Sequence, residues 1–201
     1  TNLTPHTGLV AYDVSVNFWS DHAHKRRWFS IPNGQAQLGF QPEGNWDFPK
    51  GTVWVKHFDL EITNGVAASR RKLETRFLVR GSDETYGVTY IWDAAQTNAV
   101  LASPEGEDEL IDIYNPDGSL LRTQAWRYPS QLECGICHNH SAGYALGFST
   151  AQLNRDHDYD GTITNQLLAL SEAGYLAAPL SSVETFRTLY PANDDASPLY
   201  D

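Results

Sequence analysis

The sequence predicts a mainly β protein, with a sandwich-like antiparallel β body followed by a small helical segment. From about residue 8 to residue 126 it consists of short runs rich in Val, Ile, Thr and aromatic residues, interrupted by Gly, Pro, Asn and Asp. After residue 129 the pattern changes, and apolar residues follow a helical spacing. A chain of 201 residues is long enough to bury a core of its own.

Five candidate strands lie in the β body, at residues 53–62, 73–80, 85–92, 109–114 and 121–126. In the first of them, Trp54 and Lys56 share one face, whereas Val55 and His57 share the other. Because apolar residues occur on both faces, we expect this strand to be central in its sheet. The Asn-Pro-Asp-Gly run at 115–118 predicts the turn of a hairpin that joins the last two strands.

Three helical segments are expected after the β body, at residues 150–154, 164–173 and 183–189. Thr162 or Thr164 is expected to cap the second of them, and Gly174 to follow its end. The chain is thereby divided into a β-rich body over 1–127, a segment packed on it over 128–190, and a polar linker over 191–201.

The charge balance excludes two classes of partner. With 14 Lys and Arg against 25 Asp and Glu, the net charge is −11, whereas nucleic acids and anionic bilayers bind clustered positive charge. No run of about 18 apolar residues is present, so no membrane span is expected. No G-x-S-x-G, Walker or G-x-G-x-x-G motif is present either, and no catalytic residues are assigned.

The ends of the sequence suggest a piece of a longer polypeptide. The chain starts at Thr1 without a methionine or the features of a signal peptide, and it ends abruptly at Asp201. We therefore expect an exported protein whose leader has been removed, with a further domain beyond residue 201.

The two cysteines carry most of the functional information. Cys134 and Cys137 precede His138 in a C-x-x-C-H motif, the form that attaches a c-type haem. The two thiols reach the vinyl groups of the haem, and the histidine supplies a proximal nitrogen to the iron. One covalently bound haem c is therefore expected, held against the β body by the segment over 128–190. Completion of such an attachment outside the cytoplasm implies a secreted or periplasmic location.

Other interpretations of this motif remain open. A redox-active or structural disulfide has the same C-x-x-C spacing, although it normally opens a helix in a βαβ unit. A zinc site from Cys134, Cys137, His138 and His140 would lack the usual second pair of ligands.

The distal ligand of the iron is an open question, because the chain contains no methionine. His140 lies too close along the chain to the proximal histidine to reach the opposite side of the haem. His57 is the preferred candidate, since a mid-strand histidine beside apolar residues is held rigidly. His24, His157, Lys56 and an open position remain as alternatives.

An acidic run resembles the first half of a calcium loop. Asp156, Asp158 and Asp160 alternate along the chain, and Gly161 stands at the sixth position of the loop. Leu167 occupies the twelfth position, where a calcium loop carries a bidentate Glu. We favour a polar turn whose aspartates cap the helix that follows, so calcium is possible but disfavoured.

The sequence resembles the secreted bacterial dihaem c-type cytochromes. The similar segments are residues 12–13, 18–21, 25–32, 46–58, 73–76, 134–138, 153–156 and 165–167. In that family a β-rich region carries a first C-x-x-C-H motif, and a small cytochrome c domain carries a second. The resemblance implies that Cys134 and Cys137 bind haem and that His138 is proximal, and it implies no particular distal ligand.

One departure from the family pattern concerns the second haem motif, which this sequence lacks. Residues 197–201 resemble the lead-in to that motif, so the chain looks like the first domain of a multi-haem protein. Relatives occur in large exported redox proteins, sometimes beside modules that oxidise sugars or bind carbohydrate.

The leading expectation is therefore a domain that relays electrons and is not itself an enzyme, with an adjacent haem domain or a redox protein as its partner. A haem with an open sixth position would instead react with peroxide or bind a small ligand. A haem-free β-sandwich that displays aromatic residues to a polysaccharide is the third alternative.

Overall fold

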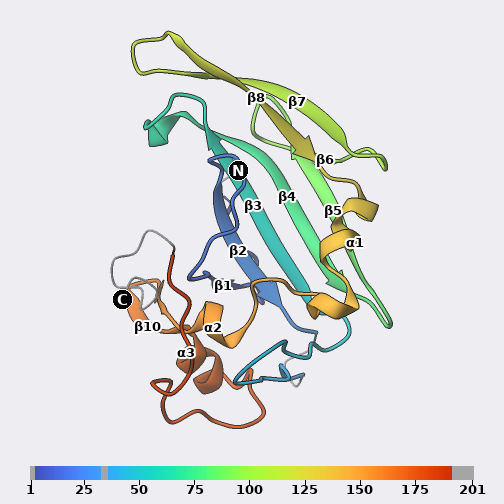
Figure 1. The fold of residues 1–201 in the computed structure, drawn as a ribbon, viewed down its shortest axis with the longest axis vertical. Coiled ribbons are helices and arrows are strands. Elements are labelled where there is room, and N and C mark those ends of the chain that lie inside the picture. Colours follow the sequence, from blue (N-terminus) through green and yellow to red (C-terminus); the bar gives the residue numbers. More distant parts are fainter. Residues whose placement is uncertain (1–2, 33–35, 192–201) are drawn as a thin grey trace.

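The computed structural model describes residues 3–32 and 36–191, and within them an antiparallel sheet forms the body of the protein (Figure 1). Its strands follow one another in chain order, so every neighbour in the sheet is also the next strand in sequence. The strands are β1 (Val10–Tyr12), β2 (His24–Ser30), β3 (Val53–Glu61), β4 (Arg70–Arg80), β5 (Thr85–Trp92) and β6 (Ala99–Leu101). The expected central position of the strand near residues 53–62 is confirmed, because β3 lies between β2 and β4.

The strand registers place residues from distant parts of the chain in rows across the sheet. Trp54 on β3 pairs with Leu78 on β4, which in turn pairs with Gly87 on β5. Since successive side chains of a strand alternate between faces, this row and the even-numbered residues of β3 up to Phe58 share one face. We call this the α1 face, because α1 (Gln131–Cys137) packs on it against β5. The other side of the sheet is called the opposite face.

A second β layer covers one end of the α1 face. It is a hairpin of β7 (Glu107–Tyr114) and β8 (Leu120–Tyr128), joined by the expected Asn-Pro-Asp-Gly turn. Trp126 of β8 packs edge-on against Phe58 at 5.8 Å between ring centroids, and Ile113 is fully buried in the same cluster. The described part of the protein thus has a two-layered β body in which the second layer is a single hairpin.

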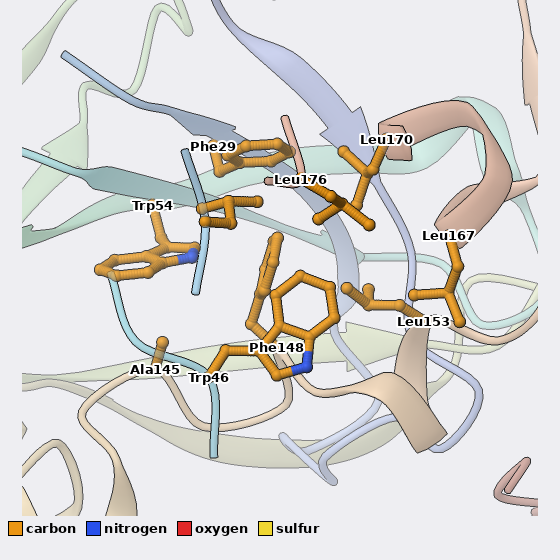
Figure 2. Close-up of a cluster of buried hydrophobic side chains, with 10 residues drawn as sticks. Phe29, Trp46, Trp54, Ala145, Phe148, Leu153, Leu167, Leu170 and Leu176 are labelled. Carbon is orange, nitrogen blue, oxygen red and sulfur yellow. The ribbon is translucent and has the colours of Figure 1, made fainter. Parts of the chain in front are cut away.

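The other end of the α1 face is covered by the segment that follows α1. There α2 (Thr150–Leu153) and α3 (Gln166–Glu172) lie beside the sheet (Figure 1). Phe148 is the centre of a ring cluster, with edge-on contacts to Phe29, Trp46 and other aromatic residues. Figure 2 shows leucines from α2, α3 and residue 176 closing this cluster. Its buried members are Phe29, Leu38, Trp46, Trp54, Ala145, Phe148, Leu153, Leu167, Leu170 and Leu176.

The helical segment differs from the expectation in three respects. Residues 183–189 form a turn, a bend and irregular chain rather than a helix. A hairpin of β9 (Asp156–Tyr159) and β10 (Thr162–Asn165) replaces the expected polar loop before α3. The cap of α3 is Asn165, whose side chain accepts a hydrogen bond from the Leu167 amide, so the expected cap by a threonine is wrong. Gly174 does follow the helix with a positive φ of 79°, as expected.

No helix in residues 3–32 and 36–191 is long and apolar enough to cross a membrane. The expected linker over 191–201 falls, apart from Pro191, outside the residues that the structure describes.

The buried contact between the two β layers predicts a large stability effect at one position of β7. Replacement of Ile113, which is fully buried, by Ala should lower the free energy of unfolding by about 2–5 kcal/mol. Leu110 on the same strand is 73% exposed, and its replacement by Ala should change the free energy by less than about 0.5 kcal/mol. Urea unfolding of the two variants measures the difference, and equal losses would contradict the assignment of Ile113 to the core.

Candidate functional site

The C-x-x-C-H motif lies on α1 and just beyond its end. The start of this helix is well defined, because Ser130 and Glu133 form a reciprocal capping box. Glu133 also receives hydrogen bonds from Arg127 at 2.9 and 3.1 Å. The Arg127 hydrogen bond and those from Ser130 lower the pKa of Glu133 to about 2. The helix is therefore attached directly to the end of β8. It is absent from the elements expected from the sequence.

The two thiols of the motif are free and lie one helical turn apart. Cys134 is half-buried against β5, and burial raises the pKa of its thiol. A Cβ atom on Gly87 would lie 2.7 Å from the Cys134 Sγ atom, so only glycine permits this close approach. Cys137 is exposed.

His138 is oriented by a hydrogen bond behind its ring. Its Nδ1 atom lies 2.6 Å from the carbonyl oxygen of Tyr144. A carbonyl only accepts, so Nδ1 carries the proton and the lone pair is on Nε2. Tyr144 is held in turn by a hydrogen bond from its hydroxyl to the Asp83 carbonyl, and by the Arg80 guanidinium 4.3 Å from its ring. This is the arrangement by which proteins orient a metal-binding histidine.

A row of cations crosses the α1 face beside the motif. Arg27 on β2 pairs with Lys56 on β3, which pairs with Arg76 on β4. We call these three residues the cation row. Phe58 lies on one side of the row in the core under β8, and Trp54 lies on the other side in the core around Phe148. Like charges placed directly opposite on neighbouring strands repel, and here they occur in a strongly acidic protein.

The two arginines of the cation row have acidic partners. Arg76 donates hydrogen bonds to both oxygens of Glu74, at 2.5 and 2.8 Å, and Glu74 is fully buried. Arg27 pairs with Asp13 at 3.2 Å and donates to Asn17 at 2.7 Å.

Lys56 differs from the arginines, because its amine faces aromatic rings. Its Nζ atom lies 5.2 Å from the ring centroid of Phe58 and 5.8 Å from that of Phe18. Burial, followed by the positive charges of Arg27, Arg76 and Lys25, lowers the pKa of Lys56 to about 7. Burial also lowers the pKa of His138, and the charges of Lys56 and Arg76 lower it further.

Two buried polar atoms on the same face lack a hydrogen-bond partner within the described residues. They are the indole nitrogen of Trp54 and the hydroxyl of Thr85, which is two residues from Gly87 on β5. Buried donors are normally satisfied, so unpaired ones on the face that carries the motif and the cation row suit a site that receives a bound group. Haem c matches this set, since it takes two thiols, an imidazole nitrogen and partners for two anionic propionates.

The structure does not bring His57 to the motif. Its side chain is fully buried on the opposite face, with Nδ1 2.8 Å from the Thr75 hydroxyl and Nε2 3.0 Å from Asp59. Both ring nitrogens are thereby engaged, and the sheet itself separates them from His138. The physical reason is the strand alternation, which sends Lys56 and His57 to different faces.

The other histidine alternatives also lie apart from the motif. His24 pairs in the strand register with Asp59, the residue that binds His57. The Nε2 atom of His24 lies 3.1 Å from Glu61. His157 belongs to the β9–β10 hairpin, where its ring contacts Tyr159 at 4.7 Å.

The acidic run around Asp158 forms the β9–β10 hairpin rather than a loop before a helix. Asp158 accepts a hydrogen bond from the Gly161 amide at 2.6 Å and so closes the turn. Asp156 and Asp160 are exposed. In the described part of the chain, no group of three or more His, Cys, Asp or Glu residues is placed to hold a metal ion.

From the sequence we named the motif and preferred His57 as the distal ligand, with Lys56 only among the alternatives, and we did not identify the residues around the motif. The alternation read along residues 53–60 placed Lys56 correctly, and the same reading of 24–30 would have added Arg27. The carbonyl of Tyr144 has no sequence signal, because any residue supplies one.

No family model matches this chain, and no curated protein or solved structure matches it.

The close approach of Cys134 to β5 predicts a specific effect at Gly87. Replacement of Gly87 by Ala forces α1 away from the sheet, and we expect a loss of about 1–3 kcal/mol in the free energy of unfolding. Gly135 within α1 has open space around it, so its replacement by Ala should be neutral or slightly stabilising. Thermal unfolding of the two variants tests the contact, and an unperturbed Gly87 variant would disprove it.

The pair of His57 and Asp59 predicts a pH dependence of stability. Burial acts to raise the pKa of Asp59, but hydrogen bonding to His57 and the charges of His57 and Arg26 together lower it. Folding therefore favours the carboxylate, so this stabilisation is present above the unfolded-state pKa and is lost as pH falls through the folded-state pKa.

The stability difference between the wild type and an Asp59→Asn variant should accordingly shrink as pH is lowered from about 6 to about 3. Urea unfolding across this range measures it. A difference that is constant or grows toward acid would show that the carboxylate does not stabilise the fold.

Proposed function

We propose that this chain is a c-type haem domain that relays electrons in an exported redox protein. The observation that carries the proposal is the geometry of His138, whose Nδ1–H is held by the Tyr144 carbonyl while Nε2 keeps a lone pair. A histidine held in this way beside two free thiols on one helix is what covalent haem attachment requires.

The cations near the motif favour a ligand that carries anionic groups. Cys134 and Cys137 would form the thioether bonds, and His138 would bind the iron as proximal ligand. Arg27 and Arg76 of the cation row would stabilise the propionates, and the unpaired Trp54 and Thr85 groups offer further donors. The bound iron would carry the electron by cycling between its ferric and ferrous forms.

Within this class we propose a first, β-rich domain of the secreted bacterial dihaem c-type cytochrome type. The basis is the sequence resemblance, and the mainly β fold with few helices is compatible with it. The partner would then be an adjacent haem domain or a separate redox protein. The protein would be secreted or periplasmic, and its electron transfer would be linked to the oxidation of sugars or polysaccharides. The net charge of −11 favours a partner with a basic docking surface, whose association rate falls as salt increases.

Expression with a haem-maturation system tests the proposal. The wild-type protein should show a Soret band and a sharp α-band when reduced, and the colour should remain with the polypeptide on a denaturing gel. A variant with Cys134→Ala and Cys137→Ala should lose the covalent colour completely. Ile136 lies between the cysteines and is 73% exposed, so Ile136→Ala should retain it.

A colourless wild-type protein would overturn the proposal. Stoichiometric zinc would then assign the motif to a zinc site, and a Cys134–Cys137 disulfide would assign it to thiol chemistry.

A further inference from the structure

We infer that the ε-amine of Lys56 is the second axial ligand of the iron that His138 binds. The inference rests on the proposed haem function and goes beyond it, because the motif determines only the proximal ligand. A second ligand must be a donor atom close to His138 that has no other partner. The chain has no methionine, so a nitrogen donor is required for a strong sixth ligand from within it.

Lys56 is placed on the correct side of the sheet for this role. It lies on the α1 face in the middle of the central strand β3, whereas His57 and His24 lie on the opposite face. The row of Lys56 and Arg76 on this face lies next to the row of Trp54, Leu78 and Gly87, and Cys134 of the motif packs on Gly87. The backbone at Lys56 is paired with β2 and β4 on both sides, so the side chain starts from a rigid sheet rather than from a loop.

The amine of Lys56 has no hydrogen-bond acceptor or carboxylate partner among the residues that the structure describes. This separates it from Lys25, whose Nζ atom donates to the Phe18 carbonyl at 2.7 Å. It also separates Lys56 from Arg76 and Arg27, which hold carboxylates of their own. An amine on a half-buried side chain that faces two phenyl rings and lacks an acceptor is in an unfavourable place for a simple ion.

The charges around Lys56 favour the form that binds a metal. The groups facing it are Arg27, Arg76 and Lys25, which repel its proton, and Glu74, which attracts it and is already paired with Arg76. Ligation forms a bond from Nζ to the iron as one proton leaves to solvent, and no oxidant or reductant is consumed. The repulsion within the cation row thus favours ligation, because it disfavours the protonated amine, which cannot bind the iron.

Two nitrogen ligands would make the iron six-coordinate and low-spin in both oxidation states. A lysine amine in place of a methionine sulfur as the sixth ligand predicts a lower reduction potential than that of a cytochrome with a His and Met pair. The haem would then have no open position for peroxide.

The experiment uses the full chain carrying covalent haem, with the spin state as its readout. The ferric wild type should be low-spin by electron paramagnetic resonance and visible spectroscopy. Lys56→Ala should retain the covalent haem but become high-spin, with loss of the low-spin signal and rapid binding of cyanide. Lys56→Arg keeps the stem and the positive charge but supplies no neutral amine, so it should also be high-spin and controls for misfolding of the alanine variant.

Two matched variants complete the test. Lys50→Ala removes an exposed lysine just before β3 and should leave the spectrum unchanged. His22→Ala removes the histidine from the loop that also carries Phe18, and should likewise leave the haem low-spin.

The possible failures are distinguishable. A wild type that attaches haem but is high-spin, or a Lys56→Arg variant that stays low-spin, overturns the assignment of Lys56 and leaves the proposed function intact. Loss of the low-spin signal in His22→Ala alone transfers the role to His22. A wild type that never attaches haem overturns both proposals.

Discussion

The register between β3 and β4 is the constraint on which the site depends. Lys56 pairs with Arg76, and His57 pairs with Thr75. The register therefore places Lys56 and Arg76 together on the α1 face, and His57 and Thr75 together on the opposite face. A slip by one residue would exchange the faces of every side chain on β3. Two apolar cores on the α1 face prevent this slip, because Trp54 belongs to one core and Phe58 to the other. The cation row lies between these two cores, so their packing also fixes the position of the cation row.

Buried Glu74 links this charged row to the second β layer. It accepts two hydrogen bonds from Arg76 and a third from the indole nitrogen of Trp126, at 3.1 Å on β8. A buried carboxylate is tolerated only when it is paired and hydrogen-bonded in this way. Since β8 leads directly into α1, the same contact positions the helix that carries the thiols. The core, the ion pair and the candidate haem site are therefore parts of one continuous arrangement.

Local chemistry explains which elements could be predicted from the sequence. Strand β5 was predicted with its observed ends, and β7 and β8 were predicted to within two residues, because their alternation is regular and a strong turn separates them. Strand β2 was missed, since its His-Lys-Arg-Arg run hides the alternation that burial reveals. Helix α1 was missed because it is short and its only strong signal is the Ser130 and Glu133 capping box. The β9–β10 hairpin was missed because alternating aspartates suggested a calcium loop instead.

The sequence by itself determined the chemical content of the candidate site: the two thiols and the histidine of the C-x-x-C-H motif, the lack of methionine, and the alternation that separates Lys56 from His57. Tertiary structure decided which of those two residues faces the motif. The choice depends on which side of β3 receives α1, and that side is set by packing of Trp126, Cys134 and Phe148 from later parts of the chain. The sequence of a strand shows which residues share a face. It does not show which of the two faces will be covered, because that depends on the residues that pack on the strand from elsewhere in the chain.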